Sequence, residues 1–160
     1  MLLDGFNHLA VVTADTEGFV TFFTEVFEAD PGLLREVAGA AVGLIPPGTE
    51  VLAGLELGGV PVATALSLET GLPVAFVRKK AKEYGTAKLA EGADIAGRRV
   101  LIVEDIVTTG GQVVLSARDL RERGATLVGA LCVIDRSEGR HQLAAENLDL
   151  ISLFTAADLG

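Results

Sequence analysis

Apolar runs and helix-like stretches alternate along the chain from residue 31 onward. Helical apolar spacing predicts three helices, at residues 31–45, 60–70 and 111–124. Short, continuous apolar runs predict five strands, at residues 50–54, 73–78, 99–104, 126–135 and 148–154. Strands that are apolar along their whole length belong to parallel sheets covered on both faces. The pattern therefore predicts an α/β fold built on a parallel sheet.

The first thirty residues have no such regular pattern. The stretch "HLAVVTADTEGFVTFF" could hold one or two strands or a small flap. With 160 residues, the chain is long enough to bury a core and short enough for one domain. We expect residues 1–160 to form a single domain, with a front segment at about residues 1–30 and a core at about residues 31–160.

Composition and charge narrow the class of protein. A net charge of −9 argues against general nucleic-acid binding, and no apolar run is long enough for a membrane span. The N-terminus lacks the cationic start of a secretory signal, so we expect a cytoplasmic protein. The single Cys132 is expected to be buried in a strand, without an internal disulfide. His8 and His141 have no partner at metal-ligand spacing and are interpreted as surface or packing residues.

Cations are concentrated in one place. Five of the thirteen lie within eleven residues, directly after the strand predicted at 73–78: Arg78, Lys79, Lys80, Lys82 and Lys88. A charge cluster alone usually marks a solvated loop. Ligands of parallel sheets, however, bind beyond the carboxyl ends of the strands, so this loop is also a candidate ligand site.

The stretch "VLIVEDIVTTGGQ" changes from apolar to polar within one residue. Glycines at 110 and 111 allow a tight turn, so backbone N–H groups and two Thr hydroxyls can converge on a phosphate at the start of the next helix. The Walker motif GxxxxGK[ST] and the dinucleotide-binding fingerprint GxGxxG are both absent. Glu104 and Asp105 would repel a phosphate, but they accept hydrogen bonds from sugar hydroxyls or share a bound Mg²⁺. A ligand with a 5′-phosphate beside a ribose diol fits both the acid pair and the turn that follows it.

This stretch resembles the phosphoribosyl diphosphate motif of the type I phosphoribosyltransferases. "FVRKKAKEYGTAKLAEG" (76–92) resembles the mobile catalytic loop of the orotate phosphoribosyltransferases. "VIDRSEG" (133–139) is similar to their Asp-Arg segment, and "AGLELGGVP" (53–61) to their diphosphate loop. The resemblance covers residues 27–159 in the family's motif order. It implies a parallel-sheet type I phosphoribosyltransferase fold with a short, atypical N-terminal hood region.

The resemblance also implies a role for each matching residue. Glu104 and Asp105 would hold the ribose hydroxyls, and Lys82, Tyr84 and Asp105 would be catalytic. The 5′-phosphate would lie in the loop formed by Ile106, Val107, Thr108, Thr109, Gly110, Gly111 and Gln112, with Thr108 also near the base. Diphosphate would be bound by Arg78, Lys79, Lys82 and Tyr84, and by the loop of Glu56, Leu57, Gly58 and Gly59. Arg136 would pair with the orotate carboxylate, because a planar guanidinium suits a bidentate contact.

The implied reaction joins orotate to phosphoribosyl diphosphate and releases diphosphate, a step of pyrimidine biosynthesis. Mg²⁺ would act as cofactor, held mainly by the diphosphate, in a homodimer whose subunits share the basic loop. The front segment lacks the family's Lys-Ser-Gly. Two alternatives stay open: a phosphoribosyltransferase for another, purine base, and a non-catalytic regulatory protein that binds phosphoribosyl diphosphate. Taken alone, Arg136 could instead form a surface ion pair with Glu138.

Overall fold

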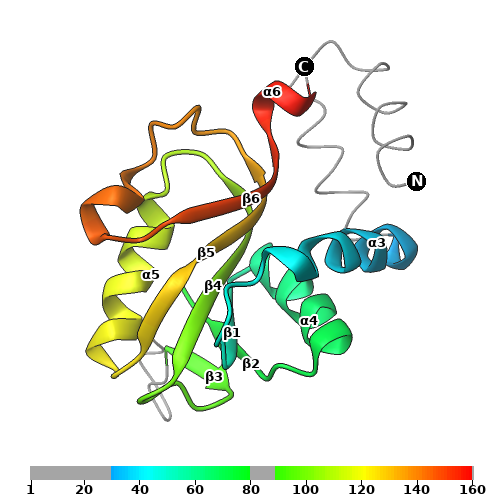
Figure 1. The fold of residues 1–160 in the computed structure, drawn as a ribbon. Helices are drawn as coiled ribbons and strands as arrows, with labels where there is room; N and C mark the ends of the chain where they lie inside the picture. Colours follow the sequence, from blue (N-terminus) through cyan, green and yellow to red (C-terminus); the bar gives the residue numbers. More distant parts are fainter. Residues whose placement is uncertain (1–29, 80–88, 160) are drawn as a thin grey trace.

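The computed structural model describes residues 30–79 and 89–159, which form a six-stranded sheet (Figure 1). Its strand order is β3-β2-β1-β4-β5-β6. All neighbouring strands are parallel except β2 and β3. The strands are β1 (Val51–Leu55), β2 (Val74–Val77), β3 (Ala90–Gly92), β4 (Arg99–Val107), β5 (Thr126–Asp135) and β6 (Leu150–Thr155). The α/β fold with a mostly parallel sheet is confirmed.

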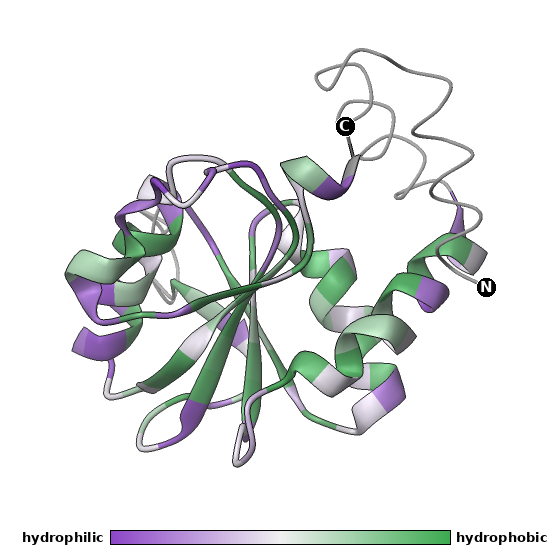
Figure 2. Ribbon diagram, turned by 45° about the horizontal axis from the view of Figure 1, so that its top comes forward, coloured by the Kyte–Doolittle hydropathy of each residue, from purple (hydrophilic) through white to green (hydrophobic). Residues whose placement is uncertain are grey.

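Helices cover both faces of the sheet. The α-helices are α3 (Pro31–Ala41), α4 (Gly59–Thr70), α5 (Gly111–Glu122) and α6 (Ala156–Leu159), and the 3₁₀ helices are η1 (Val42–Leu44) and η2 (Gln142–Glu146). Two separate apolar clusters result, one under α3 and α4 and the other under α5. Figure 2 shows the hydrophobic residues concentrated along the strands and on the inward sides of these helices.

The helix boundaries follow from local chemistry. Helix α3 begins where the Asp30 carboxylate accepts hydrogen bonds from the N–H groups of Gly32 and Leu33, with Pro31 in the first turn. The helix predicted at 31–45 changes to a 3₁₀ turn after Ala41 and ends at Leu44. Ile45 is extended because it precedes a proline. Helix α4 ends at Gly71, whose φ of 75° is readily adopted only by glycine.

Two expectations about the strands are corrected. The strand predicted at 99–104 continues to Val107, because Ile106 and Val107 pair with Ile134 and Asp135 of β5. Strand β3 was not predicted, since its three residues contain no apolar run. It forms an antiparallel edge beside β2. Among the described segments, no helix has the length and apolarity needed to cross a membrane.

Cys132 is buried in β5, as the sequence predicts. Burial, reinforced by the nearby charge of Asp135, raises the pKa of its thiol. A neutral thiol is a poor nucleophile, so this residue serves the core.

Candidate active site

The predicted ligand-binding residues that the structure describes lie at the carboxyl ends of four neighbouring strands. Glu56, Leu57 and Gly58 follow β1, and Gly59 is the first residue of α4. Arg78 and Lys79 follow β2, and Arg136 follows β5. Glu104 through Val107 end β4, Thr108 through Gly110 form the turn, and Gly111 and Gln112 begin α5. One edge of the sheet therefore carries them all.

Close backbone approach joins the diphosphate loop to β4. A Cβ atom on Gly58 would overlap the carboxylate of Asp105, with Oδ1 at 2.6 Å. A Cβ on Gly59 would overlap the Val103 carbonyl oxygen. The Glu56-Leu57 peptide bond, in the loop between β1 and α4, is cis. Glycine at 58 and 59 thus lets the loop lie directly against the acid pair.

The two acids form one electrostatic unit. Burial, together with a hydrogen bond to Asp105 and the charge of Asp105, raises the pKa of Glu104 to about 9, while the charge of Lys79 opposes the shift. Glu104 Oε1 accepts from the Asp105 N–H at 3.1 Å, and Asp105 Oδ1 accepts from the Ile106 N–H at 2.7 Å. At neutral pH Glu104 therefore keeps its proton. Both side chains are half-buried.

The turn after β4 is built on Gly110. Its φ is 76°, and a Cβ there would overlap the Leu143 side chain. Gly111 already lies in α5, so the tight turn comes from one of the two glycines and not from both. The positive end of α5 points at this turn, which is the arrangement expected for anion binding.

Arg78 and Lys79 reach the same edge from β2. The Arg78 guanidinium lies 3.0 Å from the Glu91 carboxylate on β3. The Lys79 N–H donates to Glu56 Oε2 at 3.0 Å, which ties the basic segment to the diphosphate loop. A small cavity of about 130 Å³ is lined by residues of both segments, including Glu56, Leu57 and Arg78. Lys80, Lys82, Tyr84 and Lys88 lie outside the described residues.

Arg136 lies beside the phosphate turn. Its N–H donates to the Val107 carbonyl oxygen at 2.8 Å, and its side chain lines a cavity of about 500 Å³ with Glu138, Ala156 and Ala157. The alternative ion pair between Arg136 and Glu138 is wrong, because Glu138 pairs with Arg140 instead. The guanidinium of Arg136 therefore forms no ion pair with Glu138.

The 3₁₀ helix η2 and its contacts with the turn were not predicted from the sequence. The Gln142 N–H donates to the Thr109 carbonyl oxygen at 3.0 Å, and Leu143 is fully buried beneath Gly110. His141 is half-buried, and its Nδ1 has no hydrogen-bond partner among the described residues. The signal in the sequence was weak: one leucine in the polar stretch "RHQLAAEN".

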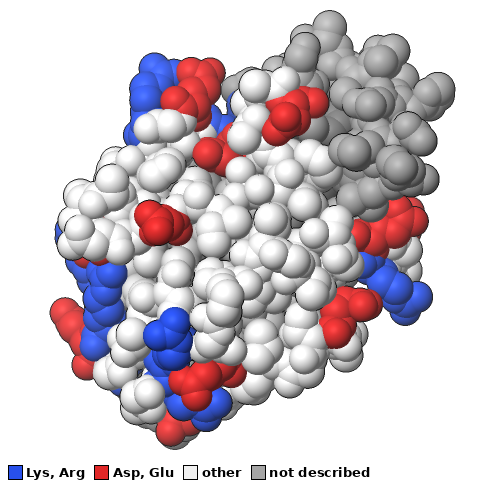
Figure 3. All heavy atoms as spheres, in the orientation of Figure 1, with Lys and Arg blue, Asp and Glu red and all other residues white. Residues whose placement is uncertain are grey.

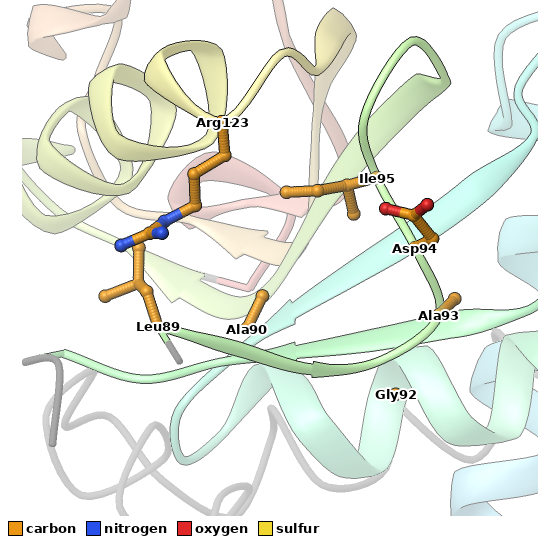
Figure 4. Close-up of a pocket in the computed structure, with 7 residues that line it drawn as sticks. All are labelled: Leu89, Ala90, Gly92, Ala93, Asp94, Ile95 and Arg123. Carbon is orange, nitrogen blue, oxygen red and sulfur yellow. The ribbon is translucent and has the colours of Figure 1, made fainter. Parts of the chain in front are cut away.

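A further cavity of about 420 Å³ lies away from this edge (Figure 4). Figure 4 shows Arg123 reaching from the end of α5 toward Leu89, with Asp94 on the opposite side. None of the residues predicted to bind substrate contributes to its lining, which consists of Leu89, Ala90, Gly92, Ala93, Asp94, Ile95 and Arg123. This cavity is distinct from the candidate active site.

Comparison with known proteins assigns the class first. Residues 25–153 match the model of the phosphoribosyl transferase domain family. A structure of the Mycobacterium tuberculosis H37Rv orotate phosphoribosyltransferase in complex with 5-phospho-alpha-D-ribosyl 1-diphosphate has a TM-score of 0.69 and 32% identity. The similarity covers 80% of this chain and 76% of that one. The fold is that of a phosphoribosyltransferase.

Curated relatives narrow the class further. Orotate phosphoribosyltransferase of Nocardioides sp. is 56% identical over 135 residues, which cover 84% of this chain and 75% of the relative. The Natronomonas pharaonis orotate phosphoribosyltransferase is 46% identical over 135 residues, covering 84% and 77%. This chain belongs to the orotate phosphoribosyltransferase family.

Proposed function

We propose that the chain transfers the phosphoribosyl group of 5-phosphoribosyl 1-diphosphate to orotate. The bond between ribose C1 and the diphosphate oxygen breaks, an orotate nitrogen loses its proton and bonds to C1, and diphosphate leaves together with the released proton. The products are orotidine 5′-monophosphate and diphosphate. The observation that carries the proposal is the contact of Asp105 with Gly58, which brings the ribose-binding acids against the diphosphate loop.

Each subsite has a described partner for one part of the substrate. Asp105 and Glu104 offer carboxyl oxygens to the ribose hydroxyls. The turn of Thr108, Thr109 and Gly110 offers N–H and hydroxyl groups to the 5′-phosphate. Arg136, free of the Glu138 pair, offers a guanidinium to the orotate carboxylate. These three subsites lie at adjoining strand ends, as a single ribosyl substrate requires.

The barrier lies in separating a cationic ribose from a highly charged leaving group. We expect Arg78 and Lys79, together with Lys82 and Tyr84, to lie where charge develops on the diphosphate. Such groups each contribute a few kcal/mol in a water-poor site. Mg²⁺ would reduce the charge of the diphosphate, and we expect its ligands to be mainly substrate oxygens. Among the described residues, no group of three or more His, Cys, Asp or Glu side chains gathers at one point.

A homodimer that shares the basic loop remains part of the proposal. The face shown in Figure 3 carries its charged side chains mostly around the rim, with few near the centre. Leu68 on α4 is 83% exposed and Leu57 in the diphosphate loop is 68% exposed. The exposed leucine of the diphosphate loop favours an interface beside the site. A single domain over residues 1–160 and a cytoplasmic location stay predictions.

The test is the absorbance change of orotate in the presence of phosphoribosyl diphosphate and Mg²⁺. Turnover with orotate is expected, and excess adenine or guanine should not compete. Competition by a purine would favour the alternative base. Binding of phosphoribosyl diphosphate without any turnover would favour the regulatory protein, whose case rests on a front segment outside the described residues.

A further inference from the structure

The connection between β5 and β6 contacts the turn after β4, formed by Thr108, Thr109 and Gly110, which we call the phosphate turn. We define the bridging segment as residues 136–146. At its start the Arg136 N–H donates to the Val107 carbonyl oxygen, and near its middle the Gln142 N–H donates to the Thr109 carbonyl oxygen at 3.0 Å. The two bonds fix the turn on both sides of Thr108.

The end of the bridging segment is anchored on the helix that follows the turn. Glu146 Oε1 accepts from the Arg118 guanidinium at 2.6 Å, and Glu146 Oε2 accepts from Arg121 at 3.1 Å. Arg121 also donates to the Glu146 carbonyl oxygen at 2.8 Å. The hydrogen bonds of Arg118 hold the pKa of Glu146 below its usual range. The bridging segment is therefore fixed relative to both the turn and α5.

The geometry of one peptide bond gives this anchoring a consequence for the ligand. In a trans peptide the carbonyl and the following N–H point in opposite directions. Because the Thr109 carbonyl points at Gln142, the Gly110 N–H points away from the bridging segment, toward the side where a phosphate would lie. Among the described residues, no hydrogen bond uses the Gly110 N–H as donor.

Leu143 keeps this arrangement in place. Its side chain is fully buried and lies where a Cβ of Gly110 would be, and it packs in the same cluster as Val107 and Val113 on either side of the turn. A rotation of the turn that broke the hydrogen bond of the Thr109 carbonyl would also disturb the packing of Leu143 against Gly110. Packing and hydrogen bonding thus favour the same orientation of the 109–110 peptide.

We propose that the Gln142 N–H, supported by Leu143, is a positioning group that turns the Gly110 N–H toward the 5′-phosphate. The proposal rests on the proposed function, because it assigns the turn to that phosphate. The bridging segment then determines the affinity for phosphoribosyl diphosphate indirectly. Its own residues are not predicted to contact that substrate and act through the turn. Orotate affinity should depend much less on Gln142 and Leu143, because Arg136 is the residue of this segment that is predicted to contact orotate.

Gln142→Pro tests the hydrogen bond directly. Proline has no N–H, and its ring would also displace the Thr109 carbonyl. The position accepts proline otherwise, since Gln142 is the first residue of η2 and His141 before it is extended, with φ −71° and ψ 157°. Gln142→Ala is the matched control, because it removes the side chain and keeps the N–H.

Affinities for phosphoribosyl diphosphate are measured by calorimetry, and the Michaelis constants of both substrates are measured for each variant. Gln142→Pro should weaken phosphoribosyl diphosphate binding by at least about tenfold, the value of one hydrogen bond to a charged group. The orotate constant should change less than about twofold, and Gln142→Ala should bind like the wild type. If the proline and alanine variants bind alike, the positioning role is wrong. Failure of the wild type to bind phosphoribosyl diphosphate would instead refute the proposed function.

A second pair of variants covers the case in which Gln142→Pro does not fold. Leu143→Val removes part of the side chain beneath Gly110, and Leu120→Val makes the same change at another fully buried leucine, on α5. The proposal expects weaker binding of phosphoribosyl diphosphate for Leu143→Val alone. Equal affinities in the two valine variants would overturn it.

Discussion

The retained proton of the acid pair makes stability depend on pH in an unusual direction. Burial beside Asp105 raises the pKa of Glu104 from 4.5 to about 9. Between these values the folded protein holds a proton that the unfolded chain has released. Unfolding then releases a proton, so rising pH favours the unfolded state. The stabilising effect of the protonated form is complete below pH 4.5 and is lost progressively as pH rises toward 9.

Glu104→Gln removes this dependence, because a glutamine keeps the neutral shape without titrating. One full proton difference changes the free energy of unfolding by about 1.4 kcal/mol per pH unit. Between about pH 5.5 and 7.5 the wild type would thus lose at most about 3 kcal/mol relative to the variant. Glu104 is half-buried, and nearby water reduces the expected difference to about 1–2 kcal/mol.

The assay is urea unfolding of both proteins across this pH range, without substrate. Only the difference between wild type and variant is used, since other titrating groups contribute to both curves. Glu122→Gln, an exposed carboxylate on α5, is the control and should run parallel to the wild type. Parallel curves for wild type and Glu104→Gln would show that Glu104 is ionised in the folded protein. The prediction that Glu104 keeps its proton would then be wrong.

Three further predictions concern the proposed reaction. Asp105→Asn should keep the fold and weaken phosphoribosyl diphosphate binding in calorimetry, because an amide is a poorer acceptor for the ribose diol; unchanged affinity would remove Asp105 from the site. Arg136→Ala should raise the Michaelis constant of orotate about ten- to hundredfold, the worth of a charge-assisted pair, and equal effects on both substrates would favour a purine. Lys82→Ala and Arg136→Ala, each inactive alone, should recover about a quarter of the wild-type rate per site when co-refolded, since half the dimers are mixed and one site in each is intact. No recovery after confirmed subunit exchange would mean that Lys82 serves its own chain.

Much of the fold could be predicted because its strands are apolar along their whole length. Strand β1 is buried at every position, and Pro46, Pro47 and Gly71 mark where neighbouring elements end. These signals are local, so a pattern of a few residues suffices. The acid pair directly after the apolar run of β4 likewise located the candidate site at a strand end.

The elements that were missed depend on partners far away in the sequence. Strand β3 is held by backbone bonds such as Arg78 N–H to the Leu89 carbonyl, and η2 by Glu146 with Arg118 and Arg121. Neither segment has the apolar periodicity that predicts a strand or helix. Long-range hydrogen bonds and ion pairs decide these elements, and the sequence shows only which residues are able to form them.

The protonation state of Glu104 beside Asp105 also could not be predicted from a local sequence pattern. From the sequence, Glu104 and Asp105 are two negative charges beside a phosphate-binding turn, an arrangement that repels the phosphate. In the structure, burial and the neighbouring Asp105 carboxylate raise the pKa of Glu104 to about 9, which favours its protonated form at neutral pH. The pair then carries one negative charge, partly balanced by Lys79. Its repulsion of an incoming phosphate is about halved, while its oxygens still accept hydrogen bonds from a ribose diol. Burial of Glu104 beside Asp105 therefore makes it possible for acids and a phosphate to share one strand end.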